Sequence, residues 1–378
     1  MTSLPQLHIC FITPYIEGYL NPGSGTHVGG AQRQQHLLAK RLREEGHTVS
    51  FIAFESDGNV PERIDGFDVW KTLPETNAPV RTPESFLKLL RSIRRVNADV
   101  YYVRGNPPLC ILSSYACSLL GSRLVYVVAN DSNVELARLS SHHSLFRYTI
   151  PKLAYLDAMR RADRVVSQTI HQRDILCNVF GIQSTIVPNG YTVPPDEEVA
   201  APSERTHVLW VGSLDPDQKR PDRFLDLVER LPEVDFRMIG WSNDEEYRRK
   251  IVGRAEALSN LDFEGFVPPD RIDQYYRTAV MLVNTSEYEG FPNTFLEAWR
   301  FGVPVVSLHY TLDGVLAEED VGYHAGTMDE MAKIVETLWE DRDSAAETGR
   351  NGREYLKSEY TIDAVYRKYE RVFSEVIY

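Results

Sequence analysis

The sequence predicts an α/β protein of two doubly wound parallel-sheet domains. Its 378 residues exceed the ~100–200 residues usual for one domain. Strand-length apolar runs alternate with helix-length amphipathic segments up to about residue 190, and the alternation restarts near residue 206. The segment between them, residues 188–204, is rich in proline and acidic side chains, as expected for an exposed linker.

The expected strands of the first half cover residues 8–15, 48–54, 100–104, 123–130, 164–169 and 184–188, with a helix over 31–45 that stops at Gly46. Those of the second half cover 207–212, 235–240, 261–267, 280–285 and 304–308. Strands alternating with helices require crossover connections, so each half is expected to form a parallel sheet covered on both faces.

The domain boundaries follow from this alternation. We expect an N-terminal domain at 1–190, a linker at 191–205, a C-terminal domain at 206–358 and a helix at 359–378, whose partner surface the periodicity does not identify. Ligands of open parallel sheets bind at the carboxyl ends of the strands. Two such domains are therefore expected to face each other across a ligand-binding cleft.

Composition excludes several classes of protein. A net charge of −13 disfavours nucleic acid as a partner. The four cysteines are too few and too irregularly spaced for a disulfide framework. The sequence begins without the pattern of a signal peptide and contains no run long enough to span a membrane. We expect a cytoplasmic protein, with the inner face of the membrane as an open alternative.

The most informative segment is residues 286–308, SEYEGFPNTFLEAWRFGVPVVSL. Asn293 is a suitable N-cap, so the following amides of Thr294 and Phe295 are expected to be unpaired and to attract phosphate. Glu289 can then reach the group attached to that phosphate, and Glu297 can accept hydrogen bonds from a ribose-type diol. The alternative is that both carboxylates are solvated surface groups.

This segment resembles the carboxylate signature of the retaining family 4 glycosyltransferases, which have the GT-B fold of two Rossmann-like domains. The matching pattern is glutamate, seven residues and glutamate, here E-GFPNTFL-E, followed by GVPVV. Residues 208–227 resemble the family's first strand in the nucleotide domain, and Lys219 matches the lysine of its basic pair. Ser213 stands where many members carry arginine, and Arg220 is a weak substitute.

Two features of the first half extend the resemblance. Gly29, Gly30 and Ala31 precede a helix and resemble the family's glycine loop, where small residues let the backbone approach a phosphate or the acceptor. A flexible turn is the alternative. Asn130 stands at the position where many family members carry a histidine that lines the transferred sugar. Its amide can hydrogen-bond a hydroxyl but cannot titrate near neutral pH.

The resemblance implies a retaining, metal-independent hexosyltransferase that moves a sugar from a nucleoside diphosphate to a hydroxyl of a sugar, glycan, lipid-linked or small-molecule acceptor. The N-terminal domain is then the acceptor side and the C-terminal domain holds the donor. The implied catalytic residues are Glu289, Lys219 and Asn130. The implied binding residues are Glu297, Gly29, Gly30, Gly212, Ser213, Phe291, Pro292, Asn293, Thr294 and Phe295. A nucleotide-sugar epimerase and a non-catalytic nucleotide-sugar-binding subunit are the alternatives.

Three further features have open interpretations. Arg104 ends a strand and can either hold an anionic acceptor or pair with a carboxylate. Residues 84–96 carry four basic side chains beside an apolar stripe, which fits a helix packed in the core and is also compatible with weak docking on an anionic bilayer. Asp215 and Asp217 are expected to be solvated charges rather than metal ligands.

Overall fold

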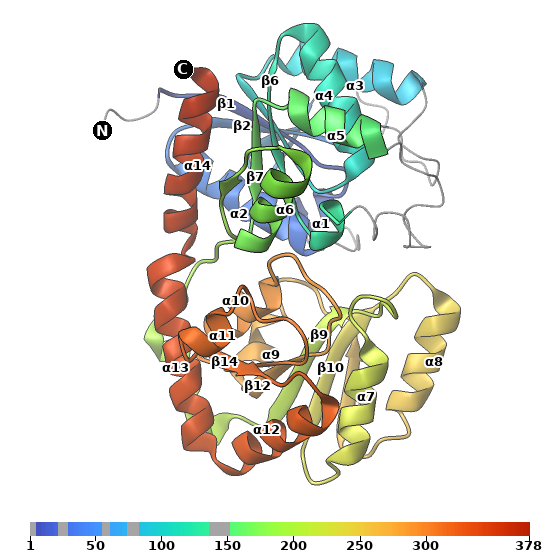
Figure 1. The fold of residues 1–378 in the computed structure, drawn as a ribbon, viewed down its shortest axis with the longest axis vertical. Helices are drawn as coiled ribbons and strands as arrows, with labels where there is room; N and C mark the ends of the chain where they lie inside the picture. The colour runs from blue at the N-terminus through green and yellow to red at the C-terminus, as the bar shows by residue number, and fades with distance from the viewer. Residues whose placement is uncertain (1–4, 22–28, 55–60, 74–82, 136–151) are drawn as a thin grey trace. The chain divides into compact units, whose positions relative to one another are not determined.

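The computed structural model describes residues 5–21, 29–54, 61–73, 83–135 and 152–378. The chain divides into two compact units. Unit 1 comprises Met1–Gly190 and Ile362–Tyr378, and unit 2 comprises Tyr191–Thr361. Each unit has its own sheet with helices on both faces (Figure 1).

The sheet of unit 1 has the strand order β3-β4-β2-β1-β5-β6-β7-β8. All its described pairings are parallel except β3 with β4. The strands are β1 (His8–Ile12), β2 (Thr48–Phe54), β3 (Glu62–Ile64), β4 (Phe67–Leu73), β5 (Val100–Arg104), β6 (Arg123–Val127), β7 (Arg164–Ser167) and β8 (Thr185–Ile186). The sequence reading missed the β3–β4 hairpin, whose turn is an Asp65–Gly66 pair with positive φ at both residues.

Helices cover both faces of this sheet. One apolar core lies between the sheet and α3 (Pro83–Val96), α4 (Pro107–Leu120), α5 (Lys152–Arg161) and α6 (Ile170–Phe180). The other core lies under α1 (Glu17–Leu20), α2 (Gly30–Glu44) and α14 (Ile362–Ile377). The central strands β1, β5, β6 and β7 therefore bury both of their faces, which explains their nearly continuous apolar runs in the sequence.

The sheet of unit 2 is parallel, with the order β11-β10-β9-β12-β13-β14. Its strands are β9 (His207–Ser213), β10 (Phe236–Trp241), β11 (Leu261–Gly265), β12 (Ala279–Asn284), β13 (Val305–Ser307) and β14 (Gly322–His324). Its helices are α7 (Pro221–Arg230), α8 (Glu245–Ala255), α9 (Asp273–Arg277), α10 (Asn293–Trp299), α11 (Val315–Glu318), α12 (Met328–Glu340) and α13 (Arg342–Glu359). The strand neighbours β9 and β12 are far apart in the sequence, and their carboxyl ends lie together.

The C-terminal helix α14 belongs to unit 1, whereas the preceding α13 belongs to unit 2. The apolar stripe of α14, which includes Val365, Tyr369 and Phe373, is buried in the unit 1 core. The hydroxyl groups of Tyr102 and Tyr369 are hydrogen-bonded at 3.0 Å. In Figure 1 this helix, in red, lies against the blue N-terminal part of the chain.

Residues 191–205, expected to form an exposed linker, are part of unit 2. Tyr191 is only 1% exposed, and its amide donates to the Tyr360 carbonyl oxygen at 2.9 Å. Arg353 donates to the Pro194 carbonyl at 2.6 Å and to Asp196 at 2.7 Å. This segment is not a free linker, because the buried side chain of Arg353 hydrogen-bonds the Pro194 carbonyl and the Asp196 carboxylate.

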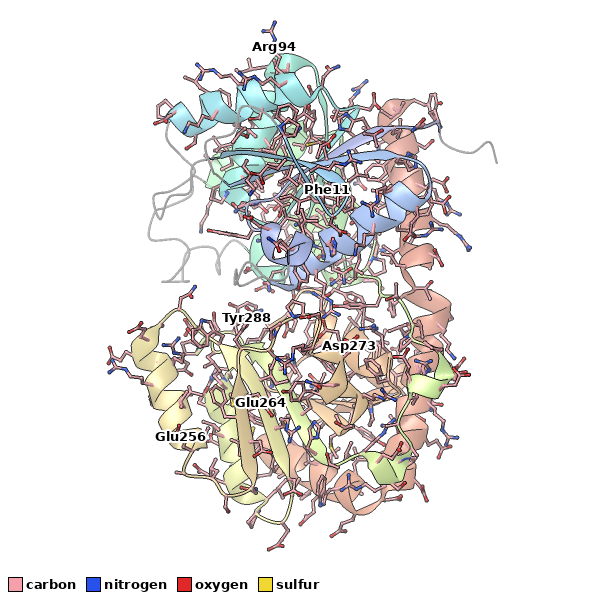
Figure 2. All side chains as sticks on the ribbon, turned by 180° about the vertical axis from the view of Figure 1, so that it is seen from behind. Phe11, Arg94, Glu256, Glu264, Asp273 and Tyr288 are labelled. Atoms are coloured by element: carbon pink, nitrogen blue, oxygen red, sulfur yellow. The ribbon has the colours of Figure 1, made fainter. Side chains whose placement is uncertain are left out.

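The stripe of α3 lies in the core, since Leu89 is 0% and Ile93 is 1% exposed. The basic side chains of Arg91, Arg94 and Arg95 are exposed. Figure 2 shows Arg94 pointing away from unit 1, whereas Phe11 lies inside it. Leu89 and Ile93 are thus packed against the sheet, whereas Leu87 of the same helix is 48% exposed.

Among the helices in the described ranges, none combines the length and apolar content required to cross a bilayer.

Truncating Phe373 to alanine is expected to destabilise unit 1 by about 3–5 kcal/mol, because this ring is fully buried and its removal leaves a cavity. Urea unfolding measures the loss. Arg371→Ala, at an exposed position of the same helix, serves as the control and should change stability by less than about 0.5 kcal/mol. Equal effects of the two substitutions would contradict the docking of α14 on unit 1.

Candidate active site

A lysine and a glutamate, from the loops that follow two neighbouring strands, form an ion pair at the carboxyl edge of the unit 2 sheet. Lys219 lies in the loop after β9, and Glu289 lies in the loop after β12. Lys219 Nζ donates to Glu289 Oε1 at 2.5 Å. The lysine side chain is 19% exposed and the glutamate side chain 5%. The pair is therefore largely removed from solvent, where a charge interaction is strong.

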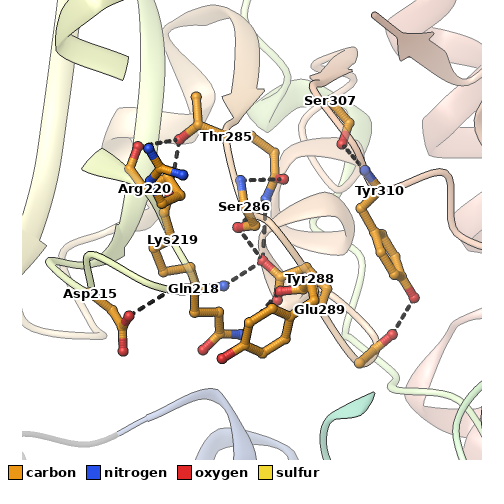
Figure 3. Close-up of polar contacts among 12 residues, drawn as sticks. Asp215, Gln218, Lys219, Arg220, Thr285, Ser286, Tyr288, Glu289, Ser307 and Tyr310 are labelled. Carbon is orange, nitrogen blue, oxygen red and sulfur yellow. Dashed lines mark hydrogen bonds and ion pairs between the residues drawn. The ribbon is translucent and has the colours of Figure 1, made fainter. Parts of the chain in front are cut away.

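Three donors converge on one oxygen of Glu289 (Figure 3). Besides Lys219, Ser286 Oγ donates to Oε1 at 2.6 Å and Asn284 Nδ2 donates at 3.3 Å. Oε2 accepts no hydrogen bond from any side chain within the described ranges. One oxygen of the carboxylate therefore holds its orientation, while the other retains its accepting capacity.

A buried threonine ties the two loops together. Thr285 Oγ1 shares its single proton between the Lys219 and Arg220 carbonyl oxygens, which lie 2.9 and 3.1 Å away. The same oxygen accepts from Trp210 Nε1 at 2.9 Å. The Glu287 amide also donates to the Gln218 carbonyl at 2.8 Å, so the lysine loop is held to the β12 loop by backbone as well as side-chain bonds.

Asp215 shapes the lysine loop. Its Oδ1 accepts from the amides of Asp217 and Gln218 at 2.9 and 2.8 Å, which makes a local aspartate turn. Asp217 is exposed, as expected, whereas Asp215 is only partly exposed. The carboxylate of Asp215 is therefore engaged in folding the loop that presents Lys219.

Two glycines, at paired positions of β9 and β10, allow close packing beneath the lysine. A Cβ on Gly240 would lie 2.6 Å from the Gly212 carbonyl oxygen. A Cβ on Gly212 would lie 3.0 Å from the Trp210 ring and 3.5 Å from Lys219 Cγ. Gly212 therefore leaves the space that the indole and the lysine stem occupy.

Ser213 and Arg220 differ in what they contribute. Ser213 ends β9 and is exposed, so it adds no charge to the site. Arg220 donates to Asp222 at 2.7 and 3.0 Å, and these hydrogen bonds raise the pKa of the arginine. Glu287 lies 3.8 Å away. The charge of Arg220 is thus balanced by carboxylates, and Lys219 is the cation that faces Glu289.

The start of α10 differs from the phosphate-binding helix N-terminus that the sequence analysis expected. Asn293 is the first residue of this helix, and its side chain is not the N-cap that the sequence indicated, since Pro292 occupies that position. The Phe295 amide is not unpaired, because it donates to the Pro292 carbonyl at 3.1 Å. Phe291 and Phe295 are buried, and Thr294 is partly exposed. The tight turn at Pro292 explains the difference.

Glu297 is buried, and both of its carboxylate oxygens accept hydrogen bonds. It is 5% exposed, Tyr191 donates to its Oε1 and Tyr276 donates to its Oε2, both at 2.6 Å. The interpretation of this residue as a solvated surface carboxylate is therefore wrong. The sequence offered no pattern that would have identified the two tyrosines, since they come from segments distant from the helix.

In unit 1, Gly29 is the N-cap residue of α2 and Gly30 is its first residue, and both are exposed. Asn130 follows β6, and its Oδ1 accepts from the Ser132 amide at 2.9 Å. The side chain therefore caps a short turn, and its Nδ2 group is the part suited to a sugar hydroxyl.

Asp131, which follows Asn130 in the chain, forms a cluster with Glu135 and His171. The sequence analysis missed this cluster because His171 is distant in the chain from the two carboxylates. One ligand atom each of Asp131, Glu135 and His171 lies within 4.8 Å of the others. His171 Nε2 lies 3.3 Å from Glu135 Oε1, and Asp131 accepts from Gln172 at 2.9 Å. These groups thus satisfy one another and their neighbours by hydrogen bonding.

Sequence comparison identifies both units. The profile described as Glycosyl transferases group 1 matches residues 196–355, and that described as Glycosyltransferase Family 4 matches residues 28–193. The chain belongs to the family 4 glycosyltransferases. An uncharacterized glycosyltransferase from Haemophilus influenzae is 24% identical to it over 306 residues, which are 77% of this chain and 79% of the relative.

Solved structures are similar to this glycosyltransferase over nearly its whole length. Sucrose-phosphate synthase from Thermosynechococcus elongatus has a TM-score of 0.80 at 18% identity, over 98% of this chain and 99% of that one. Anabaena HepE in complex with UDP-glucose has a TM-score of 0.73 at 17% identity, over 98% and 100%. The predicted GT-B fold is confirmed, and the epimerase alternative has no support from these comparisons.

Replacing Thr285 by valine is expected to lower the free energy of unfolding of the glycosyltransferase by about 1–3 kcal/mol, because the buried Trp210 donor and two carbonyl groups lose their partner. Denaturant titration followed by tryptophan fluorescence measures this loss. Thr285→Ser, which keeps the hydroxyl, should retain most of the stability. A valine variant as stable as the serine variant would contradict the bridging role of the hydroxyl.

Proposed function

We propose that this glycosyltransferase moves a hexosyl group from a nucleoside-diphosphate sugar to an acceptor hydroxyl, with retention of anomeric configuration and without a metal. The observation that carries the proposal is the desolvated Lys219–Glu289 pair at the carboxyl edge of the unit 2 sheet. This edge is where open α/β sheets bind their ligands.

Lys219 is proposed to stabilise the diphosphate as it leaves. An ammonium group has three N–H donors, and in the described part of the chain only Glu289 accepts one of them. The remaining donors can bind phosphate oxygens without breaking the ion pair. A fixed cation at a poorly solvated position stabilises the negative charge that develops on the leaving group.

Glu289 is proposed to orient the donor sugar through Oε2, because its Oε1 is already held by Lys219, Ser286 and Asn284. Glu297 is proposed to bind the ribose. Its two oxygens accept hydrogen bonds from the hydroxyl groups of Tyr191 and Tyr276. Ribose binding at this carboxylate therefore requires that the tyrosines share it or turn aside.

Retention follows if the acceptor attacks from the face that the diphosphate leaves. The bond between the anomeric carbon and the phosphate oxygen breaks, and a bond to the acceptor oxygen forms. The acceptor proton passes to the leaving phosphate oxygen. Asn130 is proposed to hydrogen-bond a sugar hydroxyl, since an amide cannot act as a general base. Gly29 and Gly30 are proposed to let the backbone approach the ligand.

The choice of donor is supported by the structural similarity to HepE, which has been solved with UDP-glucose. We therefore propose a UDP-sugar donor, with a sugar, glycan or lipid-linked acceptor in unit 1. A location in the cytoplasm or at the inner face of the membrane is compatible with these substrates.

Lys219→Ala is expected to lower kcat for transfer by on the order of 10²-fold, because it removes the cation that stabilises the leaving group. The rate of UDP release in the presence of acceptor measures this effect. Lys333→Ala is the matched control, since that side chain is 73% exposed. Full activity in both Lys219→Ala and Glu297→Gln, with unchanged Tm, would refute the assigned site.

Incubation with UDP-glucose and an acceptor panel is expected to produce an α-linked product, because UDP-glucose is itself an α-anomer and the mechanism retains configuration. Proton NMR of the anomeric signal identifies the linkage. EDTA is expected to leave the rate unchanged, since Lys219 supplies the positive charge at the leaving group. A β-linked product would refute retention, and loss of activity that Mg²⁺ or Mn²⁺ restores would refute metal independence.

A further inference from the structure

Arg104 is a buried cation of unit 1 that has neutral partners. It ends β5, a central strand of the sheet, and is 8% exposed. No carboxylate within the described ranges forms an ion pair with it, so the carboxylate-pairing alternative of the sequence analysis is not what the structure shows. Burying a charge without a counter-charge costs free energy, so such a residue is usually kept for a function.

The partners of this guanidinium are side-chain amides. Nη2 donates to Asn189 Oδ1 at 2.5 Å. When the amide of Gln168 is oriented so that its nitrogen donates to the Val128 and Ala129 carbonyls at 3.2 and 3.0 Å, its oxygen accepts from Nη2 at 2.5 Å and lies 2.6 Å from the side-chain amide of Asn189. Arg104 Nε is buried and has no hydrogen-bond partner in the described structure. The guanidinium is thus held in place from one side only.

These groups meet where ligands of such sheets bind. Arg104 is the last residue of β5, Gln168 follows β7 and Asn189 follows β8. After Arg104 the chain turns sharply through Gly105 and Asn106, which have φ values of +59° and +46°. This turn carries the backbone away from the strand end and leaves the guanidinium at the carboxyl edge of the sheet.

We propose that Arg104 binds an oxyanion, a phosphate or a carboxylate group, on the acceptor. A planar guanidinium recognises both groups through paired charge-assisted hydrogen bonds. The unpartnered Nε offers one such donor. Asn189 and Gln168 fix the ring plane without neutralising the charge, so the anion supplies the missing counter-charge. This inference rests on the proposed function, because it assigns the acceptor's chemical class to the same enzyme.

The stability of the ligand-free protein distinguishes a binding role from a structural one. If Arg104 is held for an anion, Arg104→Gln removes an uncompensated buried charge, and Tm stays the same or rises. If Arg104 serves chiefly to hold Asn189 and Gln168, the same change lowers Tm. Arg91→Gln, at an exposed position of α3, is the matched control.

The binding test uses inorganic phosphate and acetate in separate titrations, with Tm as the readout. The parent protein carries Lys219→Ala, so that the donor site contributes little to the response, and Arg104→Gln or Arg91→Gln is added to it. At least one anion is expected to raise Tm in the parent and in the Arg91→Gln protein. The Arg104→Gln protein should need a roughly tenfold to hundredfold higher concentration, given the usual strength of hydrogen bonds to charged groups.

Phosphate and acetate distinguish the two forms of oxyanion. No response of the parent to either anion, or an equal response after Arg104→Gln, would overturn the proposal. A lower ligand-free Tm for Arg104→Gln would also overturn it in favour of a structural role. UDP binding to the wild-type protein is measured separately by calorimetry, so that a failure of the proposed donor site does not count as a failure of the anion site.

Discussion

The candidate site depends on one constraint, the placement of a cation and a carboxylate at the ends of two adjacent parallel strands. Lys219 and Glu289 are 70 positions apart, yet the pairing of β9 with β12 brings their loops together. Because both side chains are mostly buried, either charge alone would be costly. Paired, they form a desolvated site that still offers donors on nitrogen and an acceptor on oxygen.

The surrounding residues serve that pair. Thr285 joins the two loops and Trp210 at a single hydroxyl. Gly212 provides the room that the indole and the lysine stem need. Ser286 fixes one oxygen of Glu289. Because these contacts arise from elements on both sides of the pair, the position of the lysine is set by the core and not by its flexible side chain alone.

The sequence predicted most of the architecture and part of the site. The strand β5 has the expected bounds, and α2 differs from its expected helix by one residue at each end, because apolar periodicity and a stopping glycine are local features. Lys219 and Glu289 were found by resemblance to a family pattern. The paired amide of Phe295 and the two tyrosines on Glu297 depend on tertiary contacts, which no local pattern encodes. The β3–β4 hairpin was predictable from its Asp–Gly turn and was missed.

The two sheets treat a cation at their carboxyl edge in opposite ways, and this difference suits the steps of a transfer reaction. Lys219 has a carboxylate partner. Under the proposed function, a bound diphosphate would share the lysine with Glu289 and could be released after transfer. Arg104 has only amide partners, so the electrostatic gain on binding an anion is not reduced by a resident carboxylate. A donor site must release its leaving group in each cycle, whereas an acceptor site must select one hydroxyl-bearing molecule from many. The proposed roles therefore fit the two sites: Lys219 in unit 2 is paired with a carboxylate, whereas Arg104 in unit 1 has only amide partners.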